Sequence, residues 1–356
     1  MTRVLELLGP STGGIRRHVA VLSKLAAARG LEVTVAAPSG VMDGLDTGDA
    51  GSETVAVPAS FHPKAVLTGI RELRALVAAD GGFDVVHAHG LKAAWTAWLT
   101  HTGAPIVLTV HNVVLDEVAG RSATVQRRLE RFITRRVARV IAVSPEIVAH
   151  LGTGRFIVPA SPEPIPTTPP AAIRARYGIP QDALLVVVAA RLHPQKDLPM
   201  FFRAWKCRTD ASAWALVVGD GPDRDTLVAL KDELGLDTLV LPGASPHAVD
   251  ELNAADLVVM SSRWEGAPLV VAEAMQLAKP IVSTRVGVVP EMVGDAGSIV
   301  DVGDADALVR EIDRYLGDES LRDRCGRLAQ ERGRSIYGAE PLVDEVLSVY
   351  DEVRPR

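Results

Sequence analysis

Two carboxylates with seven residues between them, Glu265 and Glu273, lie where a short apolar run gives way to a helical pattern. The run 257–261 is followed by a glycine-containing loop, and Pro268 suits the first turn of a helix. Backbone N–H groups at such a helix start form an anion site suited to a diphosphate, here those of Gly266, Ala267 and Leu269. The two carboxylates could then grip different parts of one extended ligand. The alternative is that both are acids on a solvated helix face.

A pair of glycines, Gly13 and Gly14, follows the first apolar run and precedes another helical pattern. A dinucleotide-binding fingerprint has the spacing G-x-G-x-x-G, which this segment lacks, and the sequence therefore disfavours an NAD enzyme. The glycines would instead let the backbone approach phosphates or an acceptor closely. The alternative is an ordinary turn before a helix.

These residues follow short β-branched runs that alternate with longer amphipathic stretches. The runs are 4–8, 32–37, 84–88, 105–110 and 139–143, and then 184–190, 214–219, 239–241, 257–261 and 280–284. Nearly continuous apolar strands separated by helices are typical of parallel sheets that are covered on both faces. The sequence therefore predicts an α/β chain with two Rossmann-like, doubly wound parallel-sheet domains. Ligands of such sheets bind at the carboxyl ends of the strands, so we expect the site in a central cleft between the domains.

A proline-rich segment separates the two sets of runs. Residues 158–170 contain six prolines, which neither a helix nor a central strand would carry. We therefore expect one domain over residues 1–165 and a second over residues 166–337. The segment 338–356 contains a last amphipathic helix, predicted over 340–353, which we expect to pack back onto the first domain.

Composition limits the function classes. Apolar residues make up 47% of the 356 and charged residues 23%, which is ordinary for a globular chain. The two cysteines imply no disulfide framework or zinc site. The longest apolar run is about eight residues, whereas a membrane span needs about 20. We therefore expect a cytoplasmic protein. The net charge of −6 disfavours nucleic acid as a partner.

One stretch is strongly basic. Residues 121–139 contain seven arginines and one glutamate, with apolar residues at helical spacing. The segment 1–158 as a whole has 17 Lys and Arg against 13 Asp and Glu, while the remainder is acidic. One reading of Arg121–Arg139 is a packed helix with a solvated face. The other is a surface for an anionic membrane or a phosphate-bearing acceptor, which would make the protein peripheral on the inner face of the membrane.

Several segments together resemble the retaining glycosyltransferases of the GT-B fold, family four (glycosyl transferases group 1). The E-x7-E carboxylates are followed by Ala274-Met275 and by the segments 279–284 and 287–291. Before them come, in the family's order, Gly13-Gly14 with His18, then 84–89 with His89, 109–112 with His111, Arg191-x4-Lys196, and 218–222 with Gly219. The resemblance covers essentially the whole chain.

The resemblance implies that residues 1–165 form the acceptor-side domain and residues 166–337 the donor-binding domain, and it implies a role for each matched residue. Arg191 and Lys196 would neutralise the diphosphate as it leaves, whereas their alternative is a surface pair beside a turn. Glu273 would bind the ribose and Glu265 the transferred sugar. His111 would lie beside that sugar, donating to a hydroxyl or positioning the acceptor, and its alternative is a buried core histidine. The other implied donor contacts are Gly13, Gly14, Gly219, Gly266, Ala267, Pro268 and Leu269, and the acceptor-side candidates are His18 and His89. Of His87 and His89 we expect one to pack and the other to face the ligand.

The resemblance also implies a reaction. We expect transfer of a hexose-type sugar from a nucleotide-diphosphate donor to an acceptor that the sequence does not identify, with retention, in cell-envelope glycan or glycolipid biosynthesis. Asp223 and Asp225 spell D-x-D but open a helix, where acids complement the dipole, so we expect no metal and no cofactor. The alternatives are a non-hydrolysing nucleotide-sugar epimerase of the same fold and a non-catalytic nucleotide-binding member.

Overall fold

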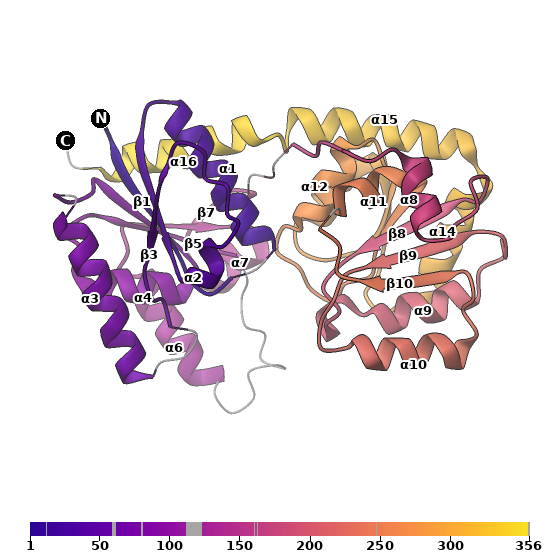
Figure 1. The fold of residues 1–356 in the computed structure, drawn as a ribbon, viewed down its shortest axis with the longest axis horizontal. Coiled ribbons are helices and arrows are strands. Elements are labelled where there is room, and N and C mark those ends of the chain that lie inside the picture. The colour runs from indigo at the N-terminus through magenta and orange to yellow at the C-terminus, as the bar shows by residue number, and fades with distance from the viewer. Residues whose placement is uncertain are drawn as a thin grey trace. The chain divides into compact units, whose positions relative to one another are not determined.

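The chain divides into two compact units, Met1–Pro162 with Gly338–Arg356, and Glu163–Tyr337. The computed structural model describes residues 1–11, 13–58, 62–79, 81–111, 123–159, 161, 163–246 and 248–354. In Figure 1 the first unit is coloured indigo to magenta, and the yellow C-terminal helix belongs to it. The division expected from the sequence, at residue 165, lies three residues from the one observed.

The first unit is built on a seven-stranded parallel sheet in the order β3-β2-β1-β4-β5-β6-β7. The strands are β1 (Arg3–Leu8), β2 (Glu32–Ala37), β3 (Gly51–Thr54), β4 (Val85–His89), β5 (Ile106–Val110), β6 (Arg139–Ala142) and β7 (Arg155–Phe156). The central strands β1, β4 and β5 are buried along almost their whole length, because helices cover both faces of the sheet. The chain order on either side of β1 is that of a doubly wound fold.

The helices of this unit are α1 (Gly14–Ala28), α2 (Ser39–Met42), α3 (Pro63–Ala79), α4 (Leu91–Thr100), α6 (Ala123–Thr134), α7 (Pro145–Leu151) and α16 (Ala339–Val353). The last of these buries one apolar face, which includes Leu342, Val346 and Tyr350. It packs beside α1, where the Arg29 guanidinium pairs with Asp344 at 2.9 Å. The C-terminal segment is therefore part of the first unit and not of the second.

The second unit is built on a six-stranded parallel sheet in the order β10-β9-β8-β11-β12-β13. The strands are β8 (Leu185–Ala189), β9 (Trp214–Val218), β10 (Leu239–Gly243), β11 (Leu257–Met260), β12 (Ile281–Thr284) and β13 (Gly297–Val300). The α-helices are α8 (Pro170–Arg176), α9 (Leu198–Lys206), α10 (Arg224–Leu234), α11 (Ala248–Ala254), α12 (Leu269–Gln276), α13 (Val289–Val293), α14 (Ala305–Gly317) and α15 (Glu319–Ser335). Two short 3-10 turns, η2 (Pro194–Lys196) and η3 (Gly294–Ala296), complete the unit.

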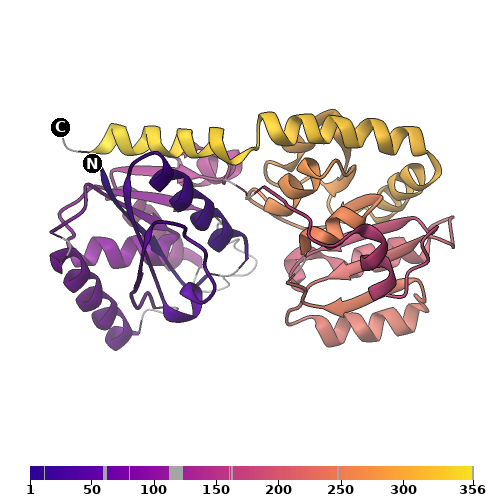
Figure 2. The same cartoon turned by 45° about the horizontal axis from the view of Figure 1, so that its top comes forward.

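Helices cover both faces of this second sheet as well (Figure 2). On one face α9, α10 and α14 bury the large side chains of the core, among them Phe201, Trp205 and Tyr315. On the other face α8 packs on α11, and α12 packs on α15. No described helix combines the length and the hydrophobicity that crossing a bilayer requires.

Candidate functional site

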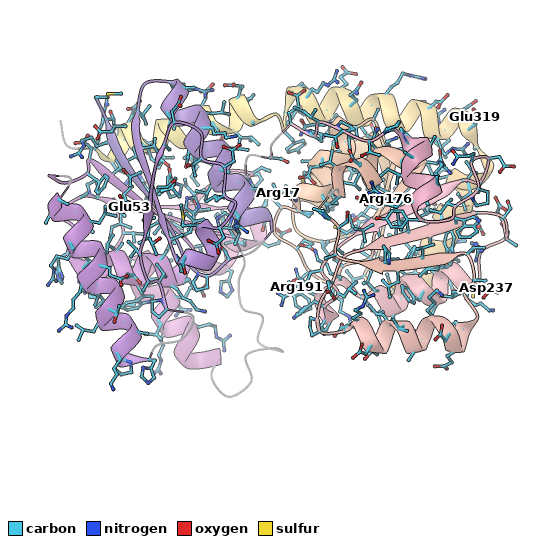
Figure 3. All side chains as sticks on the ribbon, in the orientation of Figure 1. Arg17, Glu53, Arg176, Arg191, Asp237 and Glu319 are labelled. Carbon is cyan, nitrogen blue, oxygen red and sulfur yellow. The ribbon has the colours of Figure 1, made fainter. Side chains whose placement is uncertain are left out.

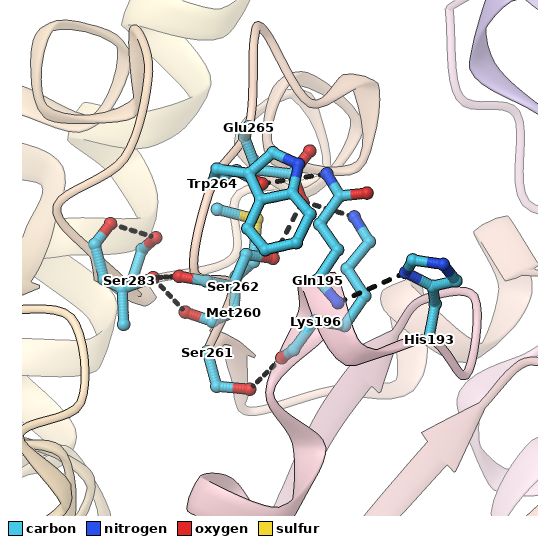
Figure 4. A network of polar contacts seen from close by, with 10 residues as sticks. His193, Gln195, Lys196, Met260, Ser261, Ser262, Trp264, Glu265 and Ser283 are labelled. Carbon is cyan, nitrogen blue, oxygen red and sulfur yellow. Dashed lines mark hydrogen bonds and ion pairs between the residues drawn. The ribbon is translucent and has the colours of Figure 1, made fainter. Parts of the chain in front are cut away.

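Two segments of the second unit meet where β8 and β11, neighbours in the sheet, reach their carboxyl ends. The turn η2 follows β8, and the loop 261–268 follows β11. Hydrogen bonds join the two segments, and Figure 4 shows those of Ser261 and of the Gln195 side chain. Ser261 Oγ donates to the Lys196 carbonyl at 2.8 Å, the Arg263 N–H donates to the Gln195 carbonyl at 2.7 Å, and Gln195 Nε2 donates to the Trp264 carbonyl at 2.8 Å. These bonds fix the relative position of the two segments.

An ion pair is held at this junction. Lys196 Nζ donates to Glu265 Oε1, and Ser262 Oγ donates to the same oxygen at 2.7 Å. The Ser262 carbonyl in turn accepts from Thr284 Oγ1 at 2.6 Å, which ties the loop to β12. Only 18% of the Lys196 side chain and 8% of the Glu265 side chain are exposed. A cation and a carboxylate therefore lie side by side in a largely shielded place, where electrostatic interactions are stronger than in water.

The second carboxylate lies inside the helix that follows. Helix α12 begins at Leu269 with Pro268 as its N-cap residue, and Glu273 is 1% exposed. Gly266, Pro268 and Leu269 at the helix start are also buried, and Ala267 is half-buried. The alternative that Glu265 and Glu273 are acids on a solvated helix face is therefore wrong.

Gly219 supports the loop that carries Arg191. A Cβ atom at Gly219, whose φ is 149°, would lie 1.7 Å from the Ala190 carbonyl oxygen. The close approach of the two loops lets the Leu192 N–H donate to the Asp220 carbonyl at 3.0 Å. Gly219 thus has a packing role, and the Arg191 side chain extends from the supported loop as an exposed group (Figure 3).

In the first unit, histidines gather around a buried glutamate. Glu6 in β1 lies directly opposite His87 in β4, and His89 lies opposite Thr109 in β5. His111 follows β5, and His18 extends from α1 with its ring centroid 5.5 Å from that of His89 and 5.6 Å from that of His111. All of these side chains are buried. The predicted histidines His18, His89 and His111 are therefore brought together.

A continuous set of hydrogen bonds joins this group. His89 Nε2 contacts Glu6 Oε2 at 2.7 Å, and His89 Nδ1 contacts His111 Nε2 at 3.2 Å. The Tyr350 hydroxyl, from α16, donates to Glu6 Oε1 at 2.6 Å and contacts His87 Nδ1 at 2.6 Å. His87 Nε2 contacts Thr109 Oγ1 at 2.6 Å. Both ring nitrogens of His87 and of His89 therefore contact internal partners, and the expectation that one of the two histidines faces a ligand stays a prediction.

Burial and the internal partners shift the pKa values of these groups. Burial alone would raise the pKa of Glu6, but its interactions with His87 and His89 outweigh burial and hold the pKa well below its usual range. Burial and His87 lower the pKa of His89 to about 4, against the opposing effect of Glu6. Burial, His89 and His18 hold the pKa of His111 well below the usual value, and burial and Glu6 raise that of Tyr350. Glu6 is therefore ionised near neutral pH, while His89 and His111 are neutral.

Among the described residues, one group of potential metal ligands is close enough to hold an ion, namely Glu6, His87 and His89, whose ligand atoms lie within 4.8 Å of one another. Hydrogen bonds inside the group already use those atoms. We therefore interpret the group as a hydrogen-bond network. Asp223 and Asp225 lie at the start of α10, where a first-turn acid complements the helix dipole.

The glycine pair of the first unit lies at the start of α1. Gly13 is the N-cap residue with a φ of 64°, and Gly14 is the first helical residue. No atom of the residues that the structure describes lies within 4 Å of a Cβ built at Gly13, so the backbone conformation and not the space requires glycine there.

The basic segment forms a helix that is shorter than predicted, α6 (Ala123–Thr134), and Arg121 lies outside the described residues. Its Phe132 is 36% exposed and stacks on Trp95, with ring centroids 5.4 Å apart. The Arg136 guanidinium lies over the Phe132 ring at 4.8 Å. An aromatic ring is therefore presented among arginines.

Sequence reasoning missed Glu6, Tyr350 and Ser262. A signal for Glu6 was present, because a carboxylate inside a buried strand of a parallel sheet requires a partner. Tyr350 gave no such signal, because its partner Glu6 lies 344 positions away in the chain.

Both halves of the chain match families of glycosyltransferases. Residues 13–168 match the family described as the glycosyl transferase 4-like domain, and residues 171–332 match the family glycosyl transferases group 1. D-inositol 3-phosphate glycosyltransferase 1 of Catenulispora acidiphila is 29% identical over 320 residues, which are 77% of this chain and 73% of that protein. N-acetyl-alpha-D-glucosaminyl L-malate synthase of Bacillus anthracis is also 29% identical, but the match spans 51% of this chain and about half, 49%, of that protein.

Solved structures show the same fold. The structure of HepE from Anabaena in complex with UDP-glucose aligns with a TM-score of 0.86 at 18% identity, covering 99% of this chain and all of that one. The two parallel-sheet units thus have the GT-B fold. The chain belongs to the glycosyl transferases group 1 family, with a glycosyl transferase 4-like domain preceding the group 1 domain.

Proposed function

We propose that this glycosyltransferase moves a hexose-type sugar from a nucleoside diphosphate donor to an acceptor, with retention of anomeric configuration. The observation that carries the proposal is the shielded Lys196–Glu265 pair at the carboxyl ends of β8 and β11, beside the start of α12. A nucleotide sugar has an anionic diphosphate and a hydroxyl-rich sugar on either side of the bond that breaks. A cation next to a carboxylate matches those two parts.

The main chemical requirement is to stabilise the diphosphate leaving group. When the bond from the sugar C1 to the phosphate oxygen breaks, its electron pair stays on the diphosphate, and that charge must be stabilised. We assign this task to Lys196, to the exposed Arg191 and to the N–H groups at the start of α12. These groups would replace a metal ion, so the reaction proposed here needs none.

The carboxylates would then bind hydroxyls. Glu265 would accept hydrogen bonds from hydroxyls of the transferred sugar, and the buried Glu273, inside helix α12, from those of the ribose. His111 would contact the transferred sugar from the first unit. HepE is a structural neighbour that binds UDP-glucose, and this is consistent with a nucleotide-sugar donor here.

Retention without a covalent enzyme intermediate follows from the same assignment. Glu265 is engaged by Lys196 and Ser262, and we give it no role as a nucleophile. We propose instead that the acceptor hydroxyl attacks C1 on the face from which the diphosphate departs. The departing phosphate oxygen takes the acceptor proton, which balances the step.

We also propose that α6 docks on an anionic membrane surface, which would place a cytoplasmic enzyme at the inner face of the membrane. Phe132 stands exposed among the exposed cations Arg131, Arg135 and Arg136, a combination suited to lipid headgroups. Binding to anionic vesicles should exceed binding to neutral ones and fall with salt. Changing Arg127, Arg128 and Arg131 to Glu should abolish it, whereas changing Lys64, Arg71 and Arg74 of α3 to Glu should not. Equal binding to both vesicle types would instead favour a soluble, phosphate-bearing acceptor.

The experiment for the main proposal uses a panel of nucleotide sugars with a short alcohol as surrogate acceptor. Release of nucleoside diphosphate and formation of a glycoside with the donor's anomeric configuration are expected. Lys196→Ala should lose this activity, and Lys206→Ala, an exposed lysine of α9, should keep it. Interconversion of the nucleotide sugar without release of diphosphate would point to an epimerase and contradict the proposal.

A further inference from the structure

The network around Glu6 has no function in the reaction as proposed so far, although it ends on His111. We infer that Glu6 and Tyr350 are positioning residues, which fix the proton positions along His89 and His111 so that His111 presents Nδ1 as a hydrogen-bond acceptor. This inference rests on the proposed function in placing His111 against the transferred sugar. The protons can be assigned one bond at a time, beginning at the glutamate.

The contacts of the Tyr350 hydroxyl determine which nitrogen of His87 carries a proton. The tyrosine hydroxyl has one proton, which it donates to Glu6 Oε1. Its oxygen, 2.6 Å from His87 Nδ1, must therefore accept, so His87 carries a proton on Nδ1. The tyrosine thus holds Oε1 of the carboxylate, while Oε2 contacts His89 and also lies 3.2 Å from His87 Nδ1.

The second assignment concerns His89. An ionised carboxylate can only accept, so the 2.7 Å contact from Glu6 Oε2 requires a proton on His89 Nε2. The neutral imidazole has one N–H, and the low pKa of His89, about 4, keeps it neutral at pH 7. Its Nδ1 therefore has a lone pair, which points at His111.

The third assignment follows for His111. His89 Nδ1 accepts, so the proton in the 3.2 Å contact belongs to His111 Nε2. His111 is also neutral, since its pKa lies well below the usual value. Its Nδ1 is therefore an acceptor. The expectation that His111 donates to a sugar hydroxyl reverses: a substrate hydroxyl would donate to His111.

The hydrogen bonds from Glu6 through His89 to His111 form a relay, and the direction in which they donate depends on Glu6. Without a fixed acceptor at Nε2, His89 can carry its proton on Nδ1 and donate to His111 Nε2. His111 would then carry its proton on Nδ1 and become a donor, with every heavy atom in the same place. A purely structural role for Glu6 would not produce this reversal.

The test uses the full chain labelled with ¹⁵N-histidine, because long-range ¹H–¹⁵N correlations distinguish the two neutral tautomers. The variants His89→Gln and His111→Gln assign the signals. Wild-type protein at pH 7 should show both His89 and His111 protonated on Nε2. Detection of His111 protonated on Nδ1, or as a cation, would overturn the inference without any further variant.

Variants then test the dependence on Glu6. Glu6→Gln should convert His111 wholly or partly to the Nδ1–H form and lower kcat/KM by about 10- to 100-fold, the range for loss of an orienting partner. The control is Glu130→Gln, which alters another Glu–His pair of the same unit, the buried Glu130 with the exposed His150 at 2.8 Å, and should change neither quantity. An unchanged His111 tautomer in folded Glu6→Gln would refute the relay. If Glu6→Gln does not fold, Tyr350→Phe replaces it in the test. We expect partial conversion of His111 to the Nδ1–H form in this variant, and an unchanged His111 tautomer would again contradict the relay.

Failure of this inference and failure of the proposed function are distinguishable. Affinity for nucleoside diphosphate should be the same in wild type and Glu6→Gln, because that site is assigned to the second unit. Loss of turnover with normal nucleotide affinity and a reversed tautomer supports the relay. Absence of nucleotide binding in wild type would contradict the proposed function. The tautomers of His89 and His111 can be measured in either case and test the relay separately.

Discussion

The histidine network makes the first unit sensitive to acid. A histidine whose pKa falls on folding binds fewer protons in the native state than in the unfolded one, so protonation favours unfolding. For His89 the folded value is about 4, and the ordinary value of an unfolded histidine is about 6.5. Its contribution to stability is therefore fully present above pH 6.5 and is lost progressively as the pH falls from 6.5 toward 4.

The loss can be estimated for a change from pH 7 to pH 5. The unfolded histidine becomes almost fully protonated over this range, whereas His89 in the native state remains mostly neutral, and the difference amounts to about 2 kcal/mol. His111 acts in the same direction, since its pKa is also depressed. Glu6 adds little here, because its depressed pKa costs stability only as the pH falls below about 4.5. The other groups that face His89 are His18 and His87, and Tyr350 contacts His87 and Glu6 behind them.

Hydrogen exchange measured by mass spectrometry reads out this effect for each unit. The opening free energy of β1 and β4 should fall by about 2 kcal/mol or more between pH 7 and pH 5, relative to that of β8 in the second unit. His89→Gln keeps an N–H donor for Glu6 but does not titrate, and should reduce the slope. His101→Asn, which removes an exposed histidine of the same unit, should leave it unchanged. Equal pH dependence in β1, β4 and β8 would refute the reasoning.

Three further predictions concern the second unit. Arg191→Ala should lower kcat/KM about 100-fold or more, the scale of a lost charge stabiliser, while Arg203→Ala at an exposed position of α9 should not. Normal turnover by Arg191→Ala would exclude Arg191 from the site. Activity should survive EDTA, because cationic side chains and backbone N–H groups take the leaving-group charge, and a loss that Mg²⁺ or Mn²⁺ restores would contradict this. Gly219→Ala should destabilise the unit by on the order of 3 kcal/mol in denaturant unfolding, because its Cβ meets the Ala190 carbonyl at a strained φ. Gly317→Ala, with no neighbour within 4 Å, is the control, and an equal effect of the two would exclude the packing role.

The sequence predicted the interior of each sheet well and the edges poorly. All ten apolar runs correspond to strands. Nine of these strands lie inside their sheets, where burial on both faces needs a continuous apolar sequence, and the tenth, β10, is an edge strand. The strands β3, β7 and β13 were missed. Each lies at the edge of its sheet, where one neighbour is absent, and β3 and β7 are exposed along their length. Little apolar signal remains in such segments.

The candidate site, too, could be predicted from the sequence only in part. Lys196 and Glu265 could be proposed from a family motif, but their pairing with Ser262 depends on β8 and β11 being neighbours, which no local pattern specifies. The histidines were visible as residue types, yet their direction of hydrogen bonding depends on Glu6 and Tyr350. Those two residues meet only because α16 returns to the first unit.

The central claim is that the second unit binds a nucleoside diphosphate through α12, the helix that contains Glu273. Calorimetric titration of the full chain with uridine, guanosine, adenosine, cytidine and thymidine diphosphates tests it most directly. At least one should bind, and Glu273→Ala should weaken that binding by at least about tenfold, since hydrogen bonds to a charged group contribute about 1.5–3 kcal/mol each. Glu233→Ala, an exposed carboxylate of α10, should bind as wild type does. No binding of any of the five at millimolar concentration, or equal affinity in wild type and Glu273→Ala, would contradict the account.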